Sequence, residues 1–485
     1  MKIKLIAIIV AAVILVGVGT GVGAAIYANL PQNVAANAVM GAFEDLLERD
    51  EVKPIYNTLT KGSITASVKG VTQDDVDLLN GVTASGKMYF STKAFMLEDF
   101  KVEAEDFKVA GDLYVSDDMV YISEEEIIKN AYGIKIDELA EDLEESIFAF
   151  GSGSKYAITD EEEYDKFIDM LESFDSEEMQ KDAEKLYEEL FKKMWKIACD
   201  NFEFDSENDE ERINGEKEKV RVVSIVIDGE MLANAMEDLY DYLRKDDSIV
   251  KFLEKYENVF AAYEFADGDK TLAEQYEEML DEAGDKLDET CEEIEDAVEE
   301  EIVIKIMTPR ISQKLVKLEV EIDGESVFAI DLGMKGIKKT DKITLSVAGE
   351  KVLTYKVKEN TNKKFECTVD VGDYVNVKLS MNKGTEEYSL LVTKEPVWSE
   401  YDVGFNVTVK GKITVKGDKT TLTIDKISSG EESVKCDITF VIDESDKIPS
   451  VPKKFDRISD ITEEDIEEWA EKIADIGAPA TSPIG

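Results

Sequence analysis

Two long stretches of the chain alternate apolar and polar residues with a period of two, and this alternation constrains the fold more than any other feature. The first stretch covers residues 63–122 and the second covers residues 301–445. A period of two places the apolar residues of a strand on one face of a sheet. Turn sequences such as Asp323-Gly324, Asn382-Lys383-Gly384 and Lys416-Gly417-Asp418 separate the runs of the second stretch. Both stretches are predicted to be antiparallel strand meanders with one buried face.

The segment between them, residues 137–300, is predicted to be an acidic, mainly helical insertion. Apolar residues recur there at helical spacing, and a single strand interrupts the run. The expected helices are Tyr164–Leu171, which a Thr159/Glu162 capping box would begin, Leu186–Ala198, Met231–Tyr240, Ile249–Tyr256 and the longest, Thr271–Glu300; the expected strand is Val220–Ile227. A terminal helix over residues 462–476 is expected to begin at Thr462 with Asp465 as its capping partner. The predicted fold is therefore α+β, with residues 477–485 as a disordered tail.

The N-terminal residues 1–30 are predicted to form a transmembrane helix. Leu5–Tyr27 contains no charge over 23 residues. A helix of this length would be about 35 Å long, enough to cross a hydrocarbon core of about 30 Å. Lys2 and Lys4 precede the segment and acidic residues follow it, which favours a cytoplasmic N-terminus. The chain is thus expected to be a single-pass protein of the cell membrane, with residues 31–475 outside the cytoplasm.

An alternative explanation of the same segment is a cleaved secretory signal. Leu5–Val16 would serve as the hydrophobic region, and Gly23-Ala24-Ala25 or Ile26-Tyr27-Ala28 as the cleavage site. The chain would then be secreted. In either case Pro31 is expected to end the first helix, and a short amphipathic helix is expected to continue to about Arg49.

Composition excludes several classes of function. The net charge of −52 repels nucleic-acid phosphates, so no nucleic-acid partner is expected. The absence of histidine removes Ser-His-Asp and Cys-His catalysis and histidine-ligated zinc. No catalytic residue, cofactor site or metal site is predicted, and the protein is not expected to be an enzyme. The acidic runs Glu207–Glu211 and Asp267–Asp269 do not fit the twelve-residue calcium-binding loop, because glycine is absent at its sixth position, and they are interpreted as solvated charge.

The four cysteines, Cys199, Cys291, Cys367 and Cys436, form no C-x-x-C pair. A thiol redox motif and a zinc ribbon are therefore not expected. Cys367 and Cys436 lie in phase with apolar residues of predicted strands, so each is interpreted first as a small buried residue. Outside the cytoplasm a disulfide between Cys367 and Cys436 is the alternative.

The order of elements resembles that of the LolA and LppX class of extracytoplasmic proteins. It resembles more closely the uncharacterised membrane-anchored proteins of low-GC Gram-positive bacteria. The most characteristic piece is Val220–Leu243, a strand that runs through Ile227-Asp228-Gly229-Glu230 into an amphipathic helix. The resemblance implies a large curved antiparallel sheet packed with helices, and a lipid or other hydrophobic ligand held between them. The chain departs from LppX in having no lipid-modified cysteine and in its long acidic insertion.

The candidate ligand cavity consists of aromatic and methionine side chains of the helical insertion, which would face the sheet. They are Phe191, Met194, Trp195, Met231 and Met236. The alternative is that these residues are ordinary core. Trp398, beside Pro396 on a loop that connects strands, is interpreted either as an exposed contact residue or as a buried one. The expected function is thus a membrane-tethered extracytoplasmic binding protein. The alternative is a structural or interaction protein of the cell envelope that meets basic partners through its acidic region.

Overall fold

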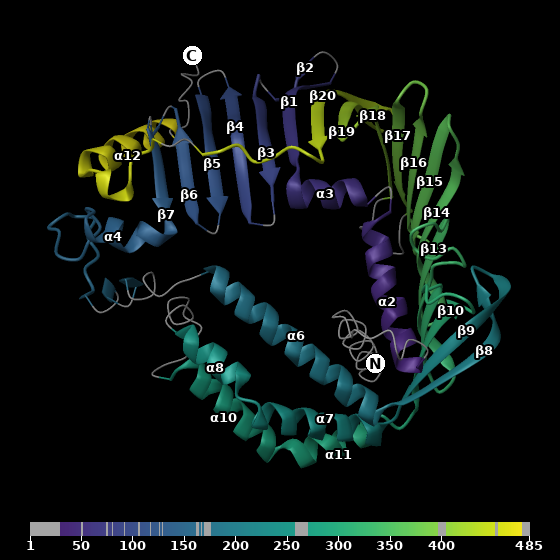
Figure 1. Ribbon diagram of the computed structural model, residues 1–485. Helices are drawn as coiled ribbons and strands as arrows, with labels where there is room; N and C mark the ends of the chain where they lie inside the picture. The colour runs from purple at the N-terminus through teal and green to yellow at the C-terminus, as the bar shows by residue number, and fades with distance from the viewer. Residues whose placement is uncertain are drawn as a thin grey trace. The chain divides into compact units, whose positions relative to one another are not determined.

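A computed structural model describes most of the chain after the N-terminal segment, and its described residues form an α+β fold with twenty antiparallel strands (Figure 1). The described residues are 30–49, 52–73, 76–79, 81–91, 93–104, 107–116, 118–125, 127–128, 130–161, 164–165, 167–168, 176–257, 270–395, 404–451 and 454–477. A large antiparallel sheet accompanied by helices is therefore confirmed.

The chain divides into two compact units, each built from separate segments of sequence. Unit 1 comprises Met1–Lys53, Glu178–Ser380 and Leu391–Phe405, and unit 2 comprises Pro54–Glu177, Met381–Leu390 and Asn406–Gly485.

Unit 1 contains six described helices and a run of antiparallel strands. The helices are α2 (Pro31–Leu47), α6 (Ser176–Asn201), α7 (Gly229–Lys245), α8 (Ser248–Lys255), α10 (Leu272–Asp285) and α11 (Leu287–Ala297). The strands pair in sequence order from β8 to β15: β8 (Glu203–Ile213), β9 (Glu216–Ile227), β10 (Ile302–Pro309), β11 (Lys317–Ile322), β12 (Glu325–Asp331), β13 (Lys342–Val347), β14 (Glu350–Asn360) and β15 (Lys364–Val371). Strands β16 (Val375–Asn382) and β17 (Glu387–Lys394) are divided between the units.

The main hydrophobic core lies on the α2 side of strands β9 to β11. Val34 of α2, Ile225 of β9 and Ile304 of β10 are fully buried, and Leu318 of β11 is nearly so. Successive side chains of a strand point to opposite faces of the sheet. The other face of these strands therefore carries a smaller core around Val222 and its neighbours. Helix α2 therefore docks on this sheet. It begins at Pro31, which occupies the first turn of α2.

Unit 2 contains a sheet in which the first strand of the chain pairs with the last. Its strands pair in the order β7-β6-β5-β4-β3-β1-β20-β19-β18, with the short β2 added to β1. They are β1 (Ser63–Gln73), β2 (Val76–Asp77), β3 (Thr83–Phe90), β4 (Ala94–Ala104), β5 (Phe107–Ser116), β6 (Met119–Glu124), β7 (Ala131–Lys135), β18 (Phe405–Lys416), β19 (Lys419–Ser429) and β20 (Glu432–Asp443). Its helices are α3 (Lys53–Lys61), η3 (Ile136–Glu138), α4 (Leu139–Glu144), η4 (Ile458–Asp460) and α12 (Glu463–Gly477).

Two predictions for the helical insertion were wrong. The expected single strand Val220–Ile227 is the second arm of a hairpin whose first arm is β8. The run Glu207–Glu211 lies on β8, where exposed carboxylates hid the strand pattern. The expected single helix Thr271–Glu300 is two helices, α10 and α11, separated at Lys286. The longest helix among the described residues is α6, with 26 residues.

The predicted transmembrane helix, Leu5–Tyr27, lies outside the described residues. Within the part of the chain that is described, no helix is both long enough and apolar enough to cross a bilayer. The Thr159/Glu162 capping box, Asp267–Asp269, Trp398 and most of the tail 477–485 lie wholly or partly outside the described residues as well.

Candidate binding surfaces

The five predicted cavity residues lie on two helices of unit 1 and differ in exposure. Phe191, Met194 and Trp195 belong to α6, and Met231 and Met236 belong to α7. Phe191 and Trp195 are buried, whereas Met236 is 37% exposed. The Trp195 ring packs edge-on against Phe204 with centroids 6.0 Å apart, within the main core. Trp195 thus has the environment of a core residue, and the ligand-cavity role of the five stays a prediction.

A second apolar surface lies on unit 2. There the pairing of neighbouring strands places apolar residues directly opposite one another, in rows that cross the sheet. One row runs Ile442, Ile64, Met88, Leu97, Leu113, Ile122 across β20, β1, β3, β4, β5 and β6. A second row runs Phe90, Phe95, Val115, Val120, Ile134 across β3 to β7. Directly opposed residues point to the same face of an antiparallel sheet. These two rows define the apolar face of unit 2.

The apolar face is incompletely buried. Val115 is 39% exposed and Ile122 is 41% exposed, and the other members of both rows are of intermediate exposure. The core residues of unit 1, by contrast, include Ile225 and Ile304 at zero exposure. Among the described residues, no helix packs broadly along strands β1, β3, β4, β5 or β20. The alternation predicted a buried face, and the structure shows a face that is partly buried.

The opposite, more polar face of the same strands carries a cover. The segment that follows β20, called here the strap (residues 444–451 and 454–457), runs across β3 to β6 (Figure 1). Asp446 accepts a hydrogen bond from Ser63 Oγ at 3.0 Å and pairs with Lys87 Nζ at 2.5 Å. Phe455 contacts the Tyr121 ring at 6.3 Å between centroids and lies over Gly133, where a Cβ would be 2.4 Å from the Phe455 ring. The strap thus covers part of the polar face, whereas the apolar face is incompletely buried.

A pocket of about 440 Å³ lies where the strap ends, lined by β6, β7, η3 and α4 together with the strap. Its lining residues are Met119, Gly133, Lys135, Glu138, Asp142, Val451, Phe455 and Arg457. Arg457 pairs there with Asp142 at 2.5 Å and with Glu138 at 3.1 Å. Because its basic groups already face carboxylates, this pocket is better explained as the anchor of the strap than as a ligand site.

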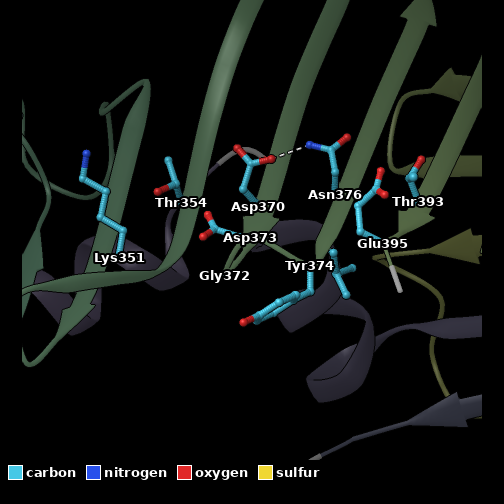
Figure 2. Close-up of a pocket in the computed structure, with 10 residues that line it drawn as sticks. Lys351, Thr354, Asp370, Gly372, Asp373, Tyr374, Asn376, Thr393 and Glu395 are labelled. Carbon is cyan, nitrogen blue, oxygen red and sulfur yellow. Dashed lines mark hydrogen bonds between the residues drawn. The ribbon is translucent and has the colours of Figure 1, made fainter. Parts of the chain in front are cut away.

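A second pocket, of about 380 Å³, lies in unit 1 at one end of β14 to β17 (Figure 2). Lys351 and Thr354 belong to β14, Asp370 to β15, Asn376 to β16 and Thr393 to β17; Gly372, Asp373, Tyr374, Val375 and Glu395 complete the lining. Asn376 donates a hydrogen bond from Nδ2 to Asp370, which Figure 2 shows as a dashed line. Three carboxylates and one lysine make the pocket polar and acidic. It is therefore unsuited to an apolar ligand.

Two further predictions concern cysteines and metals. Cys367 and Cys436 are free thiols in this structure, and the alternative bridge between them stays a prediction. Cys367 faces Val357 of β14, and Cys436 faces Val71 of β1, so neither is the cross-strand neighbour of the other. Among the described residues, no group of three or more acidic or thiol side chains is arranged to hold a metal ion.

Comparison with known proteins returns no match to a family model, a curated protein or a solved structure. The likeness to LolA and LppX therefore stays a prediction from the order of elements.

Proposed function

We propose that the protein is a membrane-tethered, extracytoplasmic binding protein without enzymatic activity, and that it holds a hydrophobic or lipid ligand on the apolar face of unit 2. The observation that carries the proposal is the incomplete burial, greatest at Val115 and Ile122, of two registered rows of apolar side chains on strands β20, β1 and β3 to β7. Large exposed apolar patches on folded domains mark interaction sites. This places the ligand on a different surface from the predicted cavity around Phe191 and Trp195.

An acyl chain suits such a face energetically. Each methylene removed from water contributes about 0.8 kcal/mol, and apolar side chains demand no hydrogen bond from the ligand. The predicted tether Leu5–Tyr27 would supply the location, because it would hold the domain beside a reservoir of lipid. The acidic pocket of Figure 2 offers no comparable apolar area.

The experiment is native mass spectrometry of the full chain extracted from membranes in mild detergent. A lipid adduct is expected on the unaltered chain and should be lost from Leu97→Gln and Leu113→Gln, which place amides in the middle of the first row. Ser85→Gln is the matched control, because Ser85 is exposed on the neighbouring strand β3 and is not a member of either row. Thermal melting of all three variants checks folding. An adduct that survives equally in all variants, or a chain that never carries one, contradicts the proposal.

A second candidate function rests on the acidic helices. The carboxylates of α10 and α11 are all exposed, from Glu274 to Asp296. We propose as the alternative that this surface meets a basic component of the cell envelope. Retention of the chain on envelope fractions should then fall steeply as salt rises, since exposed charge pairs are screened over about 8 Å at physiological ionic strength. Retention that ignores salt contradicts this alternative, and loss of lipid adducts would leave it untouched.

A further inference from the structure

Helix α3 has its apolar and polar faces reversed relative to an ordinary surface helix. Ile55 is 57% exposed, Tyr56 is 46% exposed and Leu59 is 51% exposed. The spacing from Ile55 to Leu59 is four residues, so both lie on one side of the helix. A helix that serves only to cover a domain turns such residues toward the core. In α3 they face outward.

The side of α3 that carries Thr58 is the buried one, and Asn57 bonds to the segment after β20. Thr58 is 1% exposed, and its Oγ1 donates a hydrogen bond to the carbonyl oxygen of Pro54 at 2.7 Å. Asn57 donates from Nδ2 to Glu444 Oε2 at 2.9 Å, at the start of the strap. Behind the helix, a Cβ at Gly62 would lie 2.4 Å from the carbonyl oxygen of Asp443 and 2.8 Å from Thr58 Cα. The Asn57–Glu444 hydrogen bond and the close backbone packing at Gly62 therefore hold α3 with Thr58 inward and its apolar side outward.

The charge of α3 also differs from that of the chain as a whole. The sequence of α3 is KPIYNTLTK, which has an exposed lysine at each end and no acidic residue. The chain as a whole carries a net charge of −52. A short helix with an outward apolar side, a tyrosine and flanking lysines has the composition of an interfacial helix. Its apolar residues enter the boundary of the acyl chains, and its lysines meet lipid phosphates.

We infer that α3 is a membrane-contact helix, and that the surface formed by Ile55, Tyr56 and Leu59 docks on the lipid bilayer. The inference rests on the tether of the proposed function, not on the ligand of the apolar face. The chain from Tyr27 to Lys53 includes the 17-residue helix α2. This connection spans at most about 60 Å, so the bilayer surface is within reach of α3.

The test is site-specific cross-linking in the full chain, reconstituted in phosphatidylcholine–phosphatidylglycerol vesicles. A benzophenone amino acid replaces Tyr56 in one variant and Tyr374 in the control. The two tyrosines are matched, at 46% and 47% exposure, but Tyr374 lies at the acidic pocket of unit 1. Illumination is expected to attach lipid at position 56 and not at 374. The attachment should be lost when Ile55→Ser and Leu59→Ser are added.

Each other outcome overturns the inference. If the chain binds vesicles but cross-links no lipid at position 56, the inference that α3 contacts the membrane is wrong, and the proposed tether is not affected. A cross-link from position 56 to a second copy of the chain shows that the surface is a dimer interface instead. If the chain is recovered apart from the vesicles, both the proposed tether and the inference about α3 are wrong. In all three cases the lipid-adduct test of the apolar face still stands by itself.

Discussion

Arg457 Nε lies 2.5 Å from Asp142 Oδ1, and this pair joins the end of the strap to α4. The Asp142 side chain is only 2% exposed, whereas that of Arg457 is 36% exposed. Burial raises the pKa of Asp142, and the attraction of Arg457 and a hydrogen bond from Ser459 oppose that rise without cancelling it. The carboxylate of Asp142 is thus a buried charge that is balanced by the guanidinium of Arg457.

Replacement of that partner is expected to produce a pH-dependent loss of stability. Arg457→Leu should lower the free energy of unfolding by about 2 kcal/mol at pH 7, because it leaves a buried carboxylate without its cation. The pKa of Asp142 in the folded variant would rise further above its unfolded value. A raised carboxyl pKa stabilises the fold at low pH and loses that contribution as pH rises through the folded pKa. The deficit should therefore shrink between pH 7 and pH 4.5 in urea titrations.

The double variant Asp142→Asn with Arg457→Leu is the control for this prediction. It should recover part of the loss at pH 7, since no buried charge remains. A deficit for Arg457→Leu that is constant with pH would contradict the assignment to Asp142.

Gly229 opens α7 directly beneath the C-terminal half of α11, and a side chain there should separate the two helices. A Cβ at Gly229 would be 2.8 Å from Glu295 Cα and 2.9 Å from its carbonyl oxygen. Gly229→Ala should destabilise the protein by about 1–3 kcal/mol, because the obstacle is backbone and cannot rotate away. Gly41→Ala in α2 is the control, with nothing within 4 Å of the new Cβ. It should stabilise by up to about 1 kcal/mol through helix propensity. Denaturant titration of both variants measures the two signs.

Asp446 should hold the strap down only when it is ionised. Burial favours a higher pKa for Asp446, but the hydrogen bonds from Lys87 and Ser63 outweigh burial and hold its pKa below the ordinary value. The stabilisation is present above the unfolded pKa of about 3.9 and is lost as pH falls through the folded pKa. Asp446→Asn should lower the free energy of local opening of the strap by about 1 kcal/mol. Its amides should then exchange roughly fivefold faster. Hydrogen exchange of residues 444–451 measures this, with residues 302–309 of β10 as the internal reference; unchanged strap exchange would contradict it.

The thiols should be reduced and unequal in reactivity. Burial, with a smaller effect of Asp200, raises the pKa of Cys199 to about 11. Only about one Cys199 in a thousand is then a thiolate at pH 8, so alkylation by iodoacetamide should be slow and should accelerate nearly tenfold per pH unit. Denaturation without reductant should expose all four cysteines to alkylation, as mass spectrometry would show. Fewer than four modified cysteines would indicate a disulfide.

Much of the local structure could be predicted from the sequence because its causes are local. Helix α7 begins where Asp228 Oδ1 accepts a hydrogen bond from the Met231 amide at 2.8 Å, as the Ile227-Asp228-Gly229-Glu230 segment indicated. The terminal helix begins at the predicted Thr462/Asp465 pair. The Asp323-Gly324 turn has positive φ at both residues, as a tight hairpin requires.

The sequence by itself thus determined the class of fold, most helices, the strand faces and the absence of histidine chemistry. Only the tertiary structure decided that Ser63 pairs with Asp443, which joins the first meander to the last strand of the second. A period of two identifies the face on which a residue lies, but it carries no information about the partner strand, because the backbone groups that pair are the same in every residue. For the same reason alternation could not show whether an apolar face is covered. The face with Leu97 and Leu113 is incompletely buried, and the apolar side of α3 points outward. Both features depend on contacts between residues far apart in the chain.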